Sequence, residues 1–71
     1  MASEAKNILA LALKVSADEI ADDAAIGRTE RWDSLAHMQL ILALEEALGH
    51  ALDTNAMLAI ESLADIEALV S

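Results

Sequence analysis

The feature that most constrains the fold is an apolar run that follows Asp33-Ser34 and ends at Gly49. Ten of the fourteen residues at 35–48 are apolar, and the run contains no Gly or Pro. This length and composition predict a helix rather than a strand. Asp33 and Ser34 stand where a helix needs side-chain acceptors for its first amides, and Gly49 stands at the usual stop position.

A turn of about 100° per residue divides this helix into two faces. The first face is apolar and broad enough to pack on a core. It contains Ala36, Leu40, Ile41, Ala43, Leu44, Ala47 and Leu48. The second face mixes apolar and charged side chains: Leu35, Met38, Gln39, Leu42, Glu45 and Glu46.

A helix that only supports a core would carry more polar residues on its second face. We therefore predict a docking stripe there, defined by Leu35, Met38, Leu42 and Glu46 and flanked by Glu45. Its apolar side chains would supply contact area, and its carboxylates would attract Lys or Arg on a partner. The alternative is that residues 16–33 fold over the stripe and bury it.

The remaining sequence predicts three more helical segments. A first helix runs from Glu4 to about Lys14, with Ser3 as its cap and Ile8, Leu9, Ala12 and Leu13 inward. Asp53 or Thr54 can begin a short helix that ends near Ile60. Ser62 and Asp65 resemble a capping box that opens a last helix over 63–70, with Leu63, Ile66, Leu69 and Val70 inward.

The long connection at 16–33 is unusual in so small a chain, and long loops are often functional. Ser16 and Glu19 match a capping box and predict a single helical turn. Ile20 and Ile26 are expected to attach the loop to the bundle, and Trp32 to anchor it. The predicted fold is therefore all-α, a small up-down bundle of three main helices and one short helix, with a long loop between the first two main helices.

The chain has 71 residues and a net charge of −9, which bounds the possible functions. A domain of this size buries only about 60 % of its unfolded surface, which leaves no room for a deep enzyme cleft. We expect one domain over 1–71, monomeric and without catalytic activity. All four basic residues precede Ser34, which argues against nucleic acid or an anionic membrane as partner and favours proteins with basic patches.

Three observations bear on other sites and on location. No segment reads as a membrane span or signal peptide, and the absence of Cys fits a cytoplasmic protein. Without Cys the chain has no disulfide, thiolate metal site or thiol nucleophile of its own. The acidic residues Asp18, Glu19, Asp22 and Asp23 lack the EF-hand spacing, so a solvated acidic surface is favoured over a metal site.

Asp33-Ser34-Leu35 alone would read as an ordinary helix start. In a small, acidic, helical chain with a long preceding loop, however, it resembles the acyl carrier protein family of phosphopantetheine-binding domains. The resemblance covers essentially the whole chain. It includes the first helix, the loop with Ile20 and Ile26, the Asp33-Ser34-Leu35 motif, the 43–46 stretch, the short helix ending at Ile60 and the closing helix.

The resemblance implies specific roles. Ser34 matches the serine that receives 4′-phosphopantetheine from coenzyme A, and Asp33 and Leu35 match flanking positions read by the phosphopantetheinyl transferase. Glu45 and Glu46 match acidic positions that dock partner enzymes. Leu44 and Ile60 match positions that line the space for an acyl chain. The expected partners are the transferase and acyl-transferring or synthase enzymes with basic patches.

Some residues depart from the family pattern, and alternatives stay open. Glu30, Trp32, Ala36 and Gln39 differ from common family residues, which leaves the pathway open among fatty acid, polyketide and related metabolism. An aminoacyl or peptidyl carrier, or a helical interaction module without a prosthetic group, are the alternatives. A Ser-His-Asp triad with His37 is disfavoured because adjacent Asp and Ser cannot both reach one imidazole in the required order. We expect His37 at the surface near the arm.

Overall fold

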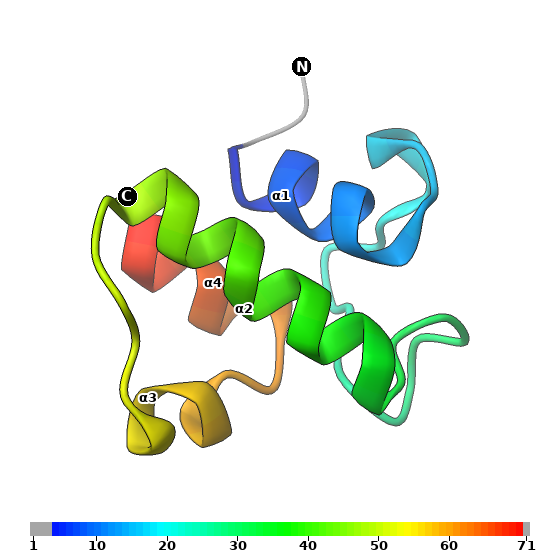
Figure 1. Ribbon diagram of the computed structural model, residues 1–71. Helices are drawn as coiled ribbons and strands as arrows, with labels where there is room; N and C mark the ends of the chain where they lie inside the picture. The colour runs from blue at the N-terminus through cyan, green and yellow to red at the C-terminus, as the bar shows by residue number, and fades with distance from the viewer. Residues whose placement is uncertain (1–3, 71) are drawn as a thin grey trace.

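The computed structural model describes residues 4–70 and contains four α-helices and one short 3-10 helix (Figure 1). Their bounds are α1 Glu4–Leu13, η1 Ala17–Glu19, α2 Ser34–Leu48, α3 Thr54–Ala59 and α4 Leu63–Val70. The all-α prediction is confirmed, and the element bounds agree with the expected ones to within a residue or two. The predicted cap of the first helix, Ser3, lies outside the described residues.

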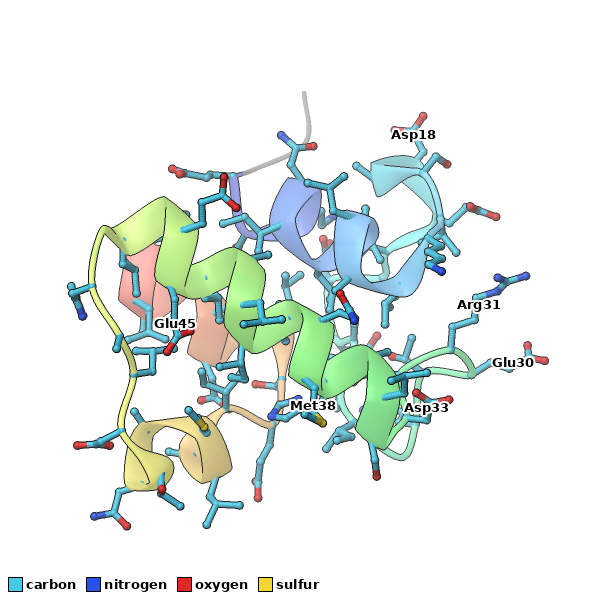
Figure 2. The ribbon with its side chains drawn as sticks, viewed as in Figure 1. Asp18, Glu30, Arg31, Asp33, Met38 and Glu45 are labelled. Atoms are coloured by element: carbon cyan, nitrogen blue, oxygen red, sulfur yellow. The ribbon has the colours of Figure 1, made fainter. Side chains whose placement is uncertain are left out.

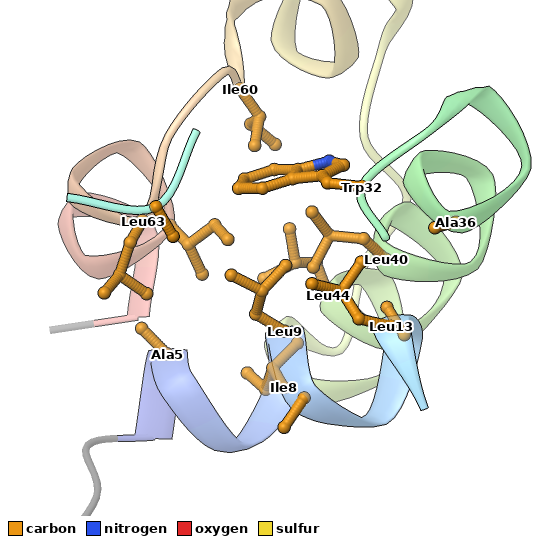
Figure 3. Packing of buried hydrophobic residues seen from close by; sticks show 14 of the residues in the cluster. Ala5, Ile8, Leu9, Leu13, Trp32, Ala36, Leu40, Leu44, Ile60 and Leu63 are labelled. Atoms are coloured by element: carbon orange, nitrogen blue, oxygen red, sulfur yellow. The ribbon is translucent and has the colours of Figure 1, made fainter. Parts of the chain in front are cut away.

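The core forms where α1, α2 and α4 meet (Figure 3). Five large side chains are fully buried there: Leu9, Leu40, Leu44, Leu63 and Ile66. The predicted inward residues of α1 are all buried. Among the described residues, no polar or charged residue is buried, so the core is held mainly by apolar contact.

α2 follows the predicted face for most of its length but not at its end. Ala36, Leu40, Ile41 and Leu44 are buried, whereas Ala47 is exposed and Leu48 is half-buried. Leu69, predicted inward in α4, is likewise 37 % exposed. A helical wheel assumes neighbours along the whole helix, whereas in the last turns of these two helices only Leu48 and Val70 pack partly against the core.

The connection between α1 and α2 is attached by backbone pairing as well as by side chains. Ala25 forms an isolated bridge with Ser62, and the Ile26 amide donates to the Glu61 carbonyl at 2.8 Å. Ile20 is buried as predicted, but Ile26 is 39 % exposed. The prediction that the Ile26 side chain pins the loop is therefore wrong, because its backbone makes that attachment.

Local capping explains where the helices begin and end. The Ser16 amide donates to the Glu19 carboxylate at 2.9 Å, and the Ser62 amide donates to Asp65 at 3.1 Å. Both predicted capping boxes therefore form. Asp53 caps α3 by accepting from the Ala56 amide at 2.8 Å.

Candidate functional site

The site begins with Ser34, the first residue of α2. Asp33 is the N-cap, and its carboxylate accepts a hydrogen bond from the Ala36 amide at 2.8 Å, as predicted. At the other end, Gly49 has a left-handed φ of 79° and donates its amide to the Glu45 carbonyl. The two caps fix where α2 begins and ends, and the Asp33 cap places the exposed Ser34 side chain at the helix start.

The start of α2 can receive an anion. Within the described residues, the amides of Ser34 and Leu35 and the Ser34 hydroxyl have no hydrogen-bond partner. Unpaired first-turn amides and the helix dipole favour negative charge at this position. A phosphate ester on Ser34 would therefore sit beside free donors. The residues present fit a phosphorylated prosthetic group.

A hydrogen-bonded bridge that the sequence did not predict includes Trp32 and His37, which lie on either side of Ser34 in the chain. The buried Trp32 ring donates Nε1–H to His37 Nδ1 at 3.0 Å, and His37 Nε2 lies 3.1 Å from the Met57 carbonyl oxygen. Because the indole nitrogen can only donate, His37 Nδ1 accepts and Nε2 carries the proton that it donates. The bridge links the loop, α2 and α3.

This bridge corrects the expected position of His37 as a surface residue. Its ring is half-buried and lies against Trp32, with ring centroids 6.1 Å apart. Both ring nitrogens are used by Trp32 and Met57, and neither bonds to Ser34 or Asp33. The geometry is therefore not that of a Ser-His-Asp triad. One signal in the sequence was available, because a buried Trp needs an acceptor and His37 follows five residues later.

The predicted docking stripe is open to solvent. Leu35 is 69 % exposed, Met38 66 % and Leu42 59 %, and Glu46 is also exposed. Residues 16–33 therefore do not cover it, which removes the burial alternative. In Figure 2, Met38 lies on the viewer's side of α2. The partner-binding role of these residues stays a prediction.

Glu45 differs from the stripe residues because the fold uses its carboxylate. One of its oxygens accepts the Leu52 amide at 2.8 Å, and the side chain is half-buried. This bond holds the link between α2 and α3 against α2 (Figure 2). Glu45 thus has a structural contact that the sequence did not predict, and Glu46 is the more available of the two carboxylates. The docking role of Glu45 stays a prediction.

Leu44 and Ile60 belong to the same core cluster and are closely packed. Leu44 is fully buried and Ile60 is 3 % exposed, and Trp32 and Leu40 lie close to them (Figure 3). A chain entering between them would have to displace packed side chains, which interiors resist. The predicted acyl-pocket role of these two residues remains a prediction.

The acidic loop is partly neutralised by two ion pairs. Lys6 Nζ lies 2.6 Å from Asp22 Oδ1, and Arg28 lies 3.5 Å from Asp23. The hydrogen bond from Lys6, reinforced by its positive charge, lowers the pKa of Asp22 below its usual value. Over residues 4–70, no three His, Asp or Glu side chains are grouped to hold a metal ion. The helices of this same part are all too short or too polar to cross a membrane.

Comparison with known families identifies the chain. The family model described as a phosphopantetheine attachment site matches residues 3–70. No curated protein and no solved structure matches the chain. The family match covers α1 through α4, including the Asp33-Ser34-Leu35 motif and its surroundings. The chain therefore belongs to the phosphopantetheine-binding carrier family, whose domains hold a covalently attached 4′-phosphopantetheine group and are not themselves catalytic.

Proposed function

We propose that Ser34 is the attachment serine. The observation that carries this assignment is the contrast among the serines of the described part of the chain. The Ser16 hydroxyl bonds to Glu19 and the Ser62 hydroxyl bonds to Asp65, whereas the Ser34 hydroxyl is exposed and has no partner there. Ser34 is also the only one of these serines at the start of a long helix.

The chain's own residues have defined tasks in this proposal. Asp33 fixes the helix start by capping Ala36, and the amides of Ser34 and Leu35 stabilise the phosphodiester. Asp33 and Leu35 are the flanking positions that a phosphopantetheinyl transferase reads. The bound arm supplies the thiol that carries cargo as a thioester, since the chain has no Cys.

We further propose that the protein acts as an acyl carrier of fatty acid, polyketide or related metabolism, monomeric and cytoplasmic. The net charge of −9 and the exposed docking stripe support transient contact with basic patches on synthase enzymes. Electrostatic attraction of this kind raises association rates without requiring a permanent complex. An aminoacyl or peptidyl carrier is the alternative, and the mass of the thioester isolated from cells separates the two.

The attachment site is tested by intact mass after incubation with coenzyme A, Mg²⁺ and a phosphopantetheinyl transferase. We expect the wild type, Ser16→Ala and Ser62→Ala to gain the mass of one arm, and Ser34→Ala to gain none while keeping its helical circular dichroism. A gain that persists in Ser34→Ala places the attachment elsewhere. No gain in any folded variant contradicts the carrier function of this chain.

The docking stripe is tested by the rate at which the phosphopantetheinyl transferase attaches the arm, here called loading. We expect Met38→Ala and Glu46→Lys to slow loading, with little change in melting temperature because both side chains are exposed. Glu67→Lys on α4 is the matched charge reversal, since Glu67 is also exposed but lies on another helix. Equal slowing by Glu46→Lys and Glu67→Lys would show a general charge effect and remove the stripe from the proposal.

A further inference from the structure

The hydrogen bond between Trp32 and His37 spans the residue Ser34 in the chain. Trp32 is in the loop, two residues before α2, and His37 lies in the first turn of α2. The Trp32 ring is buried beside Ile60 in the core (Figure 3), whereas the Ser34 side chain is exposed. The bond therefore joins the end of the loop to the helix that begins at Ser34.

This bond requires one protonation state of His37. The indole nitrogen of Trp32 can only donate, so Nδ1 of His37 must accept and cannot itself carry a proton. A proton added to the neutral ring would go to Nδ1, because Nε2 already carries one and donates it to the Met57 carbonyl. Two N–H groups would then face each other over 3.0 Å. Protonation therefore breaks the bond to Trp32 but leaves a donor for Met57.

Trp32 has no second acceptor to which it could turn. Within residues 4–70, His37 Nδ1 is the one acceptor bonded to the indole N–H. The Trp32 side chain is 2 % exposed, so water does not readily take the place of His37. Folded proteins avoid unpaired buried donors. We therefore expect the Trp32 ring, and with it the end of the loop, to shift when His37 binds a proton.

Charged side chains around His37 are engaged elsewhere. The loop, α2 and α3 contact its ring, and their nearest charged residues are Glu30, Arg31, Asp33, Glu45, Asp53 and Glu61. Asp33, Asp53 and Glu45 each accept a backbone amide. Glu30 and Arg31, with Lys14, line a groove between the end of α1 and the start of α2. Within the described residues, none of these charged groups is hydrogen-bonded or ion-paired to the His37 ring.

We propose that His37 is a proton-sensitive positioning residue for the attachment serine. Neutral His37 holds the end of the loop to the first turn of α2, and protonated His37 releases it. Histidine changes its charge between about pH 5 and pH 8, so the bond opens in mild acid. Loading should then slow, because a displaced reacting group is attacked or transferred less readily. The effect on loading rests on the function proposed above, whereas the opening of the bond does not.

The first test follows the unmodified protein by NMR from about pH 8 to about pH 5. Trp32 is the single Trp of the chain, so its indole N–H gives one isolated signal. We expect this signal to shift and to exchange faster with solvent, with the same midpoint as the ring protons of His37. His50→Ala is the matched control, because it removes the other, exposed His and should leave the transition unchanged. His37→Asn keeps a side-chain acceptor but does not titrate, so its indole signal should stay constant.

The second test measures the ratio of the loading rate of the wild type to that of His37→Asn at each pH at which the transferase is active. This ratio cancels the pH dependence of the transferase itself. We expect the ratio to fall towards lower pH with the midpoint found by NMR. Circular dichroism at each pH verifies that both proteins stay folded, so the fall reports on Ser34 rather than on global unfolding.

The proposal is overturned by an indole signal that stays constant while the His37 ring titrates, or that moves equally in His37→Asn. A His37 ring that titrates only as the whole chain unfolds overturns it as well. A loading ratio that does not change with pH removes the positioning role. Because the first test uses the protein without its arm, an indole transition in a chain that gains no arm contradicts the carrier function and the positioning role, and the proton-sensitive bond stands.

Discussion

Replacing His37 with Ala should lower the free energy of unfolding, because it breaks the bridge from Trp32 through His37 to Met57. The substitution leaves the indole N–H of Trp32 without an acceptor, and Trp32 is only 2 % exposed. An unsatisfied buried donor costs about 1–3 kcal/mol. The Met57 carbonyl also loses its donor, but Met57 is half-buried and water can replace part of that bond. We expect a total loss of about 2–3 kcal/mol in the free energy of unfolding.

Urea unfolding followed by circular dichroism measures this loss. In a domain of this size, 1 kcal/mol shifts the melting temperature by about 4–8 °C, so His37→Ala should melt about 10–20 °C lower. The control is His50→Ala, because His50 is exposed and, among the described residues, its ring is hydrogen-bonded only to the neighbouring Ala51 carbonyl. We expect that control to change stability by less than about 0.5 kcal/mol.

A double-mutant cycle with Trp32→Phe tests the reason for the loss. Phenylalanine keeps an aromatic ring at position 32 but has no N–H to leave unsatisfied. His37→Ala should therefore cost about 1 kcal/mol less in the Trp32→Phe background. An equal cost in both backgrounds would show that the Trp32 hydrogen bond contributes nothing. A loss below about 0.5 kcal/mol in the wild-type background would refute the bridge as a stabilising element.

Three other predictions concern stability. Glu45→Ala should cost roughly 1–2 kcal/mol in chemical denaturation by removing the acceptor of the Leu52 amide, and Glu45→Gln should cost less; an unchanged midpoint in both variants would contradict this structural role. Lys14→Gly should stabilise the fold by about 1 kcal/mol because it relieves the left-handed backbone, and a lower melting temperature would contradict that reason. Because the pKa of Asp22 is lowered, its pair with Lys6 stabilises the fold above the usual Asp pKa and is lost as the pH falls through the lowered value. Asp22→Asn should therefore lower the melting temperature at neutral pH more than in strongly acidic solution, and an equal effect at both would argue against the pair.

One prediction concerns the whole chain. With a net charge of −9, self-repulsion should weaken the fold at low salt, so the melting temperature should rise between about 0.01 M and 0.1 M NaCl as the Debye length falls from about 30 Å to about 10 Å. A flat or falling melting temperature over this range would contradict the argument.

Several features could be read from the sequence because their causes are local. Asp33 caps the amide of Ala36, three residues later, and Gly49 stops α2 with a backbone conformation that Gly adopts at little cost. The capping boxes at Ser16 and Ser62 also span three residues. Such contacts form whenever the segment is helical, so residue type and spacing were sufficient to place them.

Burial along the centre of α2 was also predictable, but burial at its end was not. The periodicity of the helix identifies which side chains share a face, and Leu40 and Leu44 are fully buried as expected. Ala47 shares that face and is nevertheless exposed. A helical wheel of α2 contains no information about where the neighbouring helices end.

Only the tertiary structure decided the contacts between segments distant in the chain. The His37 ring is hydrogen-bonded to the Met57 carbonyl, twenty residues away, and the Glu45 carboxylate accepts a hydrogen bond from the Leu52 amide. The Ile26 amide donates to the Glu61 carbonyl, whereas the Ile26 side chain is exposed. Lys14 and Arg31 likewise come to one groove because α1 ends beside the start of α2. The physical reason is that such contacts depend on how the packed helices bring the loops together. The local sequence around each of these residues does not indicate which residue it will contact.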